Sequence, residues 1–140
     1  MVTFEAKAIM NIPANRLIAF GGINSNGDPE EGWETVYLQL SKKGWIPDLV
    51  THVSIDKDDL VKVSVLNNPV WKAEAAQDLP AGTLVQCDDE GRVKSYSVED
   101  GNFIGYTLHS VKSGEVASFV RKYGGFPPAE NDDENGDGTG

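Results

Sequence analysis

The side chains best suited to nucleophilic chemistry in this chain of 140 residues are one cysteine, Cys87, and two histidines, His52 and His109. A thiolate beside an imidazole base can attack a substrate, so Cys87 and His109 form a candidate pair. Cys87, however, ends the apolar run LVQC, where a buried thiol is the commoner outcome, and His109 is expected on a strand surface. One cysteine and two histidines also fall short of a structural zinc site.

Two groups of carboxylates could hold a cation or move a proton. Asp56, Asp58 and Asp59 crowd one short stretch, but aspartate is also a preferred turn residue, and we expect a turn there. Residues 133–138 (DENGDG) begin like a calcium-binding EF-hand loop, yet no bidentate glutamate follows at the required position. With no nucleotide-binding, zinc-protease or hydrolase motif elsewhere, we predict no enzyme activity, no catalytic residue, no cofactor and no metal.

The elements that would position these residues come in two related copies. A shift of 67 residues lays Thr3–Phe20 on Val70–Cys87, and a shift of 58 then lays Trp33–Trp45 on Gly91–Phe103. The first alignment pairs Pro13 with Pro80, Leu17 with Leu84, Phe4 with Trp71 and Phe20 with Cys87; the second pairs Leu38 with Tyr96, Trp45 with Phe103 and Pro47 with Gly105. Phe20, Cys87, Trp45 and Trp71 are therefore expected in the core.

Each copy has the pattern of a β protein. Residues 35–40 and 61–65 alternate apolar and polar side chains with a period of two, and turn dipeptides such as Lys43-Gly44 separate the runs. The segment 73–77 is expected to be a single turn or an edge segment rather than a helix. We predict an all-β fold: a small β-barrel or sandwich built from two pseudo-repeated units, residues 2–66 and 69–123, in a single domain spanning 1–125. Residues 126–140 are expected to be a disordered acidic tail.

Charge excludes several classes of partner. The chain has 12 Lys and Arg against 22 Asp and Glu, a net charge of −10, which would repel a phosphate backbone, so no nucleic acid is expected as a partner. No apolar run approaches the ~20 residues of a membrane span, and Glu5 and Lys7 interrupt what an export signal would need. We therefore expect a soluble protein with no membrane partner.

Four segments of the second copy carry a resemblance to a known family. They are LPAGTLV (79–85), GRV (91–93), GNFIGYTL (101–108) and KSGEVASFV (112–120). This pattern resembles the small capsid decoration, or cement, proteins of tailed bacteriophages, and the first copy matches it less closely. The resemblance implies a non-enzymatic structural protein that binds the outer surface of the assembled head and stabilises contacts between major capsid subunits. It further implies a homo-oligomer, often a trimer, that is assembled in the host cytoplasm and lies on the exterior of the virion.

Two segments are expected to contact the capsid partner. The N-terminal arm, Met1, Val2, Thr3 and Phe4, is predicted to be an unpaired strand end that can add to another chain's sheet. The insertion at residues 24–33 breaks the repeat, and its candidate contacts are Asn24, Asn26, Asp28 and Trp33. Trp33 is the aromatic residue that the repeat explains least.

Two other binding functions stay open at this point. A lipoyl- or biotinyl-type carrier needs an exposed lysine at a hairpin tip, for which Lys43 before Gly44 is the nearest candidate. A carbohydrate-binding adhesin would use an exposed aromatic platform, for which Trp33 is the candidate.

Overall fold

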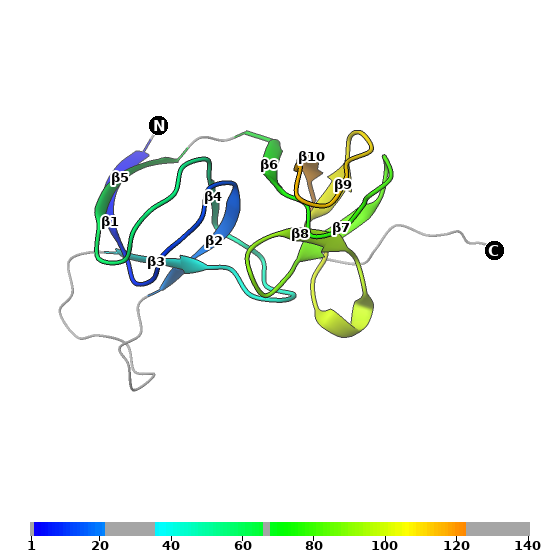
Figure 1. The fold of residues 1–140 in the computed structure, drawn as a ribbon. Helices are drawn as coiled ribbons and strands as arrows, with labels where there is room; N and C mark the ends of the chain where they lie inside the picture. The colour runs from blue at the N-terminus through cyan, green and yellow to red at the C-terminus, as the bar shows by residue number, and fades with distance from the viewer. Residues whose placement is uncertain (1, 22–35, 66–67, 123–140) are drawn as a thin grey trace.

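The computed structural model describes residues 2–21, 36–65 and 68–122, which form two five-stranded β-sheets lying side by side (Figure 1). The all-β prediction is confirmed. The first sheet contains β1 (Val2–Ala8), β2 (Arg16–Gly21), β3 (Val36–Leu40), β4 (Leu49–Thr51) and β5 (Leu60–Val65). The second contains β6 (Val70–Glu74), β7 (Leu84–Cys87), β8 (Val93–Ser95), β9 (Gly105–Thr107) and β10 (Val116–Arg121), with a short 3-10 helix η1 (Val98–Asp100) between β8 and β9. Within the described ranges no helix has the length and apolarity to cross a membrane.

The two sheets share most of their strand contacts, but β10 pairs with β9 whereas the equivalent strand β5 does not pair with β4. The first sheet has the order β4-β2-β3-β1-β5, with β1 and β3 parallel and the other neighbours antiparallel. The second has the order β6-β10-β9-β7-β8, and a parallel bridge between Ala75, directly after β6, and Val93 on β8 joins its two outer strands. The second unit is therefore a small closed barrel, whereas the first is a barrel that stays open between β4 and β5.

Equivalent hydrogen bonds fix which residues correspond. Ile12 exchanges backbone bonds with Ile55 as Leu79 does with Val111, and Ala8 accepts from Asp58 as Ala75 accepts from Gly114. Two turns with positive φ also match: Asn15 (60°) with Gly82 (77°), and Asp58 (73°) with Gly114 (88°). These pairs show that the two units have the same turns and bridges at equivalent positions.

The structure corrects the second half of the sequence alignment. The shift of 67 is right for β1 and β2, but Leu38 corresponds to Val93 rather than to Tyr96, because both form the parallel contact with the first strand of their unit. Gly105 corresponds to Leu49 rather than to Pro47, because both lie opposite matched residues of the second strand. The connecting loops change length in more than one place, which a single shift of 58 cannot represent.

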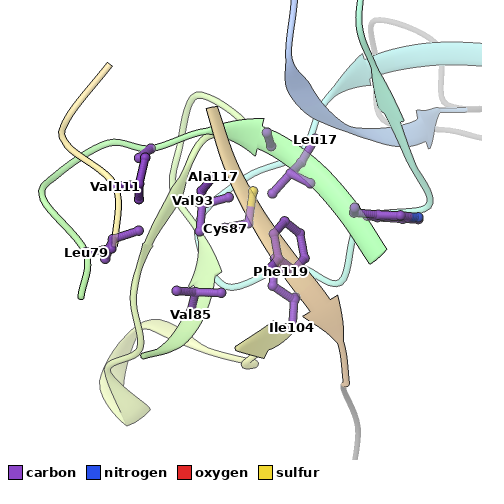
Figure 2. Packing of buried hydrophobic residues seen from close by; sticks show 12 residues of the cluster. Leu17, Leu79, Val85, Cys87, Val93, Ile104, Val111, Ala117 and Phe119 are labelled. Atoms are coloured by element: carbon purple, nitrogen blue, oxygen red, sulfur yellow. The ribbon is translucent and has the colours of Figure 1, made fainter. Parts of the chain in front are cut away.

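Each unit has its own apolar core, and the two cores meet at β2. In the second unit Val85, Cys87, Ala117 and Phe119 are fully buried, and Figure 2 shows Leu17 of β2 among them, beside Phe119. Burying a side chain of this size contributes about 1.5–3 kcal/mol. Leu17 therefore ties the first unit to the core of the second.

Two core predictions are wrong. Phe20, at the end of β2, is 38% exposed, and Trp45, in the loop after β3, is 44% exposed. Phe20 differs from its counterpart Cys87 because its unit stays open, and its ring lies edge-on to Phe4 with centroids 5.6 Å apart. Trp71 and Cys87 are buried as predicted.

Backbone hydrogen bonds join the two units at a junction that is too narrow for a side chain at position 44. The Leu17 N–H donates to the Gly91 carbonyl at 2.7 Å, and the Gly44 N–H donates to the Cys87 carbonyl at 3.0 Å. Asn102 returns a backbone bond to the Gly44 carbonyl at 3.0 Å. A Cβ atom at Gly44 would overlap the Asp100 carbonyl, and φ at Gly44 is +76°, so this junction requires glycine.

Candidate binding surface

The predicted N-terminal arm is not an unpaired strand end. Val2, Thr3 and Phe4 belong to β1 and pair antiparallel with Val65, Ser64 and Val63 of β5. Phe4 also packs against the core of the first unit. Removing these residues would therefore damage the sheet itself, so a truncation could not distinguish partner contact from folding. Met1 and the remaining predicted contacts, Asn24, Asn26, Asp28 and Trp33, lie outside the described residues, as do the tail at 126–140 and the calcium-like segment at 133–138.

Cys87 is placed for packing rather than for nucleophilic attack. Its thiol is fully buried and donates to the Asp88 carbonyl with an Sγ to oxygen distance of 3.2 Å. Burial raises the pKa of the Cys87 thiol from 9.0 to about 12, and the hydroxyl of Ser41 opposes that rise only in part. His109 lies on the surface, where its Nδ1 is 3.1 Å from the Ser110 carbonyl oxygen.

The other polar residues that the sequence indicated lie in turns and ion pairs rather than in a site. Asp56, Asp58 and Asp59 lie in or beside the turn before β5, as predicted, and Asp58 is 3.8 Å from the Lys7 ammonium. Throughout the part of the chain that the structure describes, no three His, Cys, Asp or Glu side chains cluster as metal ligands would. Lys43 lies in a turn held against the second unit, because its N–H donates to Asp89 and its ammonium is 3.8 Å from Asp100.

The open seam between β4 and β5 is the most unusual feature of the described surface. In the second unit the equivalent strands pair along β9 and β10, and the Leu108 N–H donates to the Ser118 carbonyl at 2.9 Å. Lys62 is the counterpart of Ser118, but no hydrogen bond joins β5 to β4 within residues 36–65. Among the described residues, therefore, one edge of β5 has no pairing strand.

The direction of the backbone groups on β5 follows from a single bond. The Ala8 N–H donates to the Asp59 carbonyl at 3.1 Å, in register with the β1–β5 ladder. Because backbone groups alternate sides along a strand, those of Val61 and Val63 point toward β1. The N–H and carbonyl groups of Lys62 and Ser64 therefore point into the seam.

One residue exchange coincides with the difference between the two units. A Cβ atom at Gly105 would overlap the Val120 carbonyl oxygen, so β9 and β10 can approach only because Gly105 has no side chain. Leu49 stands at this position in the first unit. Leu49 packs against the core of the first unit. Val61 and Val63 of β5 stay partly exposed, while their counterparts Ala117 and Phe119 are fully buried.

Two adjoining hollows occupy the seam and its mouth. A hollow of about 220 Å³ lies between β4 and β5 over Ile18 and Leu38. Its lining combines apolar residues of both strands with the polar residues Thr51, His52, Lys62 and Ser64. A larger cleft of about 680 Å³ continues from it to β6 and β10, where Trp71, Lys72 and Arg121 form the wall. Together they form a groove that starts at the free edge of β5 and ends at the second unit.

The mouth of this groove carries unpaired positive charge. Arg121 lies over the Trp71 ring at 4.4 Å, and its Nε atom is buried without a hydrogen-bond partner. Neither Arg121 nor the exposed Lys72 forms an ion pair with any described residue. The acid in the cleft, Asp48, already accepts the Phe20 N–H at 3.0 Å. The groove thus has an apolar floor, a free strand edge and a basic mouth.

Comparison with known proteins places the fold. No protein-family model matches the chain. Its structure is similar to that of the N base of the head fiber gp8.5 in bacteriophage phi29, with a TM-score of 0.74 and 23% sequence identity over 86% of this chain and 93% of that chain. The two proteins share a fold. The likeness covers both five-stranded units rather than one of them, since it extends over most of each chain.

The seam was not among the candidate sites that the sequence indicated. Its residues are ordinary strand residues, and the groove exists only because β4, β5 and β6 meet in space. One signal was present: a glycine that belongs to the repeated pattern in the second copy, Gly105, is replaced in the first. The misplaced alignment with Pro47 hid the leucine that replaces this glycine.

Proposed function

We propose that this chain is a structural protein of a tailed-phage head, a decoration protein that binds the outer surface of the assembled shell and stabilises contacts between major capsid subunits. The observation that carries the proposal is the likeness to a phage head fiber base across nearly the whole of both chains. The decoration-type pattern of the second copy, from Leu79 to Val120, supports it independently.

The rigid connection between the two units suits a protein that bridges capsid subunits. Leu17 and Gly44 join the units through a shared core and backbone bonds rather than through a flexible link. A rigid body that bridges subunits shifts the shell toward its assembled state by mass action, because it binds the assembled form and not the free subunits. Many identical sites on a closed shell multiply that effect. We propose a homotrimer on the shell, assembled in the host cytoplasm.

Virions of the phage whose genome encodes this chain provide the test. We expect peptide mass spectrometry to find the chain in purified virions, and mild protease treatment of intact virions to remove it while the packaged DNA stays protected. Absence from the virion, or full protection until the shell is broken open, would contradict the proposal.

A further inference from the structure

The open seam has the properties of a site for strand addition. Lys62 and Ser64 present backbone N–H and carbonyl groups to it, and the second unit shows what satisfies them: a strand that runs antiparallel to β10 and bonds to Ser118. In the first unit β4 does not play that part, since no hydrogen bond joins it to β5 within residues 36–65. An extended segment from outside can do so, since main-chain bonds supply affinity and alternate side chains supply specificity.

The groove also indicates the chemistry of the added segment. Ile18 and Leu38 form the floor, and Val61 and Val63 are half-exposed beside it, so apolar side chains at alternate positions would be buried there. At the mouth, Arg121 has a buried Nε atom without an acceptor, and Lys72 has no ion-pair partner among the described residues. A carboxylate satisfies a guanidinium best, through paired charge-assisted bonds.

We propose that the seam binds an extended acidic segment of the shell protein, which pairs as an added strand, antiparallel to β5, with the free edge at Lys62 and Ser64. The inference rests on the proposed function and deepens it by naming the surface that faces the shell.

Other occupants fit less well. A second copy of this chain fits the seam less well, because its own free edge at β5 carries Lys62 and therefore brings a positive charge rather than an acid to the basic mouth. The acidic residues after Tyr123 have the right charge. However, Pro127, Pro128 and the glycines at 136 and 138 are poor strand formers, and the segment lacks alternating apolar residues.

The test compares the full chain with paired variants in equilibrium binding to purified shells. Ser64→Pro removes the seam-facing N–H and leaves the bonds to β1 intact, and Ser64→Ala is its control, because it removes the same hydroxyl but keeps the N–H. Lys72→Glu reverses one charge at the mouth. Its control is Lys57→Glu, since Lys57 is exposed, has no ion pair with the described residues and lies outside the groove.

We expect Ser64→Pro and Lys72→Glu each to weaken shell binding roughly tenfold, and the two controls to stay within about twofold of the unchanged chain. If the unchanged chain binds shells and both test variants bind equally well, the seam proposal is wrong while the proposed function stands. If the unchanged chain does not bind shells at all, the proposed function itself fails.

Amide hydrogen exchange keeps the proposal testable if a variant does not fold. In the free full-length chain the amides of Lys62 and Ser64 should exchange rapidly, and binding to shells should slow them. Slow exchange in the free chain would show that the seam is already filled by the chain's own acidic residues or by a second copy, and would overturn the proposal.

Discussion

Leu49 on β4 occupies the position that Gly105 holds on β9, opposite matched residues of the second strand of each unit. The neighbouring strand pairs at one position and not at the other. The Val120 carbonyl lies so close to Gly105 that a Cβ atom would not fit between them. Because Gly105 has no side chain, β9 and β10 can pair and the second unit closes. Leu49 carries a side chain, which packs against the first core, and β4 and β5 remain the two outer strands of the first sheet.

Gly105→Ala should therefore destabilise the second unit by forcing β9 from β10. We expect a loss of about 3 kcal/mol in the free energy of unfolding, at the upper end for overpacking, because the obstacle is a backbone carbonyl that cannot turn aside. Urea unfolding gives the measurement. Gly82→Ala is the control: φ there is +77° but the space is empty, so only a conformational cost of about 1 kcal/mol applies. Equal losses in the two variants would show that steric exclusion at Gly105 is not the cause.

Leu17→Ala should destabilise both units, because this first-unit side chain completes the second core. Truncating a fully buried leucine costs about 3 kcal/mol, and Leu84→Ala, at the equivalent but partly exposed position, should cost less. Amide exchange gives a second readout, since the truncation at 17 should speed exchange in β7 and β10. An effect confined to the first sheet would contradict the shared core.

The pKa of Cys87 makes a separate prediction about alkaline stability. The thiol ionises near 9.0 in the unfolded chain, whereas its pKa in the folded chain is about 12, so the folded state holds more protons between these values. Below pH 9 the Cys87 thiol therefore does not change the free energy of unfolding with pH. As pH rises from 9 toward 12, ionisation of this thiol in the unfolded chain lowers the free energy of unfolding by up to about 1.4 kcal/mol per pH unit.

Unfolding free energies of the unchanged chain and of Cys87→Ala, measured from pH 8 to 11, isolate this contribution from other titrating groups. The two curves should converge as pH rises, because only the unchanged chain loses the protonated-thiol contribution. Parallel curves would mean that the thiol is not desolvated as its burial indicates.

The repeat and the strand pattern were accessible from the sequence because they depend on local features. Pro13 and Pro80 carry the alignment, and the turn residues around Asp58 and Gly114 separate the strands in both units. Phe20 and Trp45 were misplaced for the opposite reason. Their exposure depends on whether a distant strand covers them, and a residue pattern of period two does not contain that information.

The candidate binding surface was harder to predict from the sequence than the fold was. Val2, Thr3 and Phe4 looked like a free strand end because they begin the first copy, yet the strand that covers them, β5, lies about 60 positions later in the chain. The seam requires knowing that Leu49, rather than Pro47, replaces Gly105. That correspondence follows only from the hydrogen-bond register, which loop lengths shift and sequence identity alone does not reveal.

Binding to the outside of a phage head can be measured by titrating the full-length protein onto purified shells that lack it and counting bound copies by sedimentation. We expect saturable binding, with a fixed number of copies per shell set by the symmetry of the shell, and a higher temperature of shell disruption once the sites are full. Binding that never saturates, or protein that stays in the supernatant at every concentration, would contradict the proposed function.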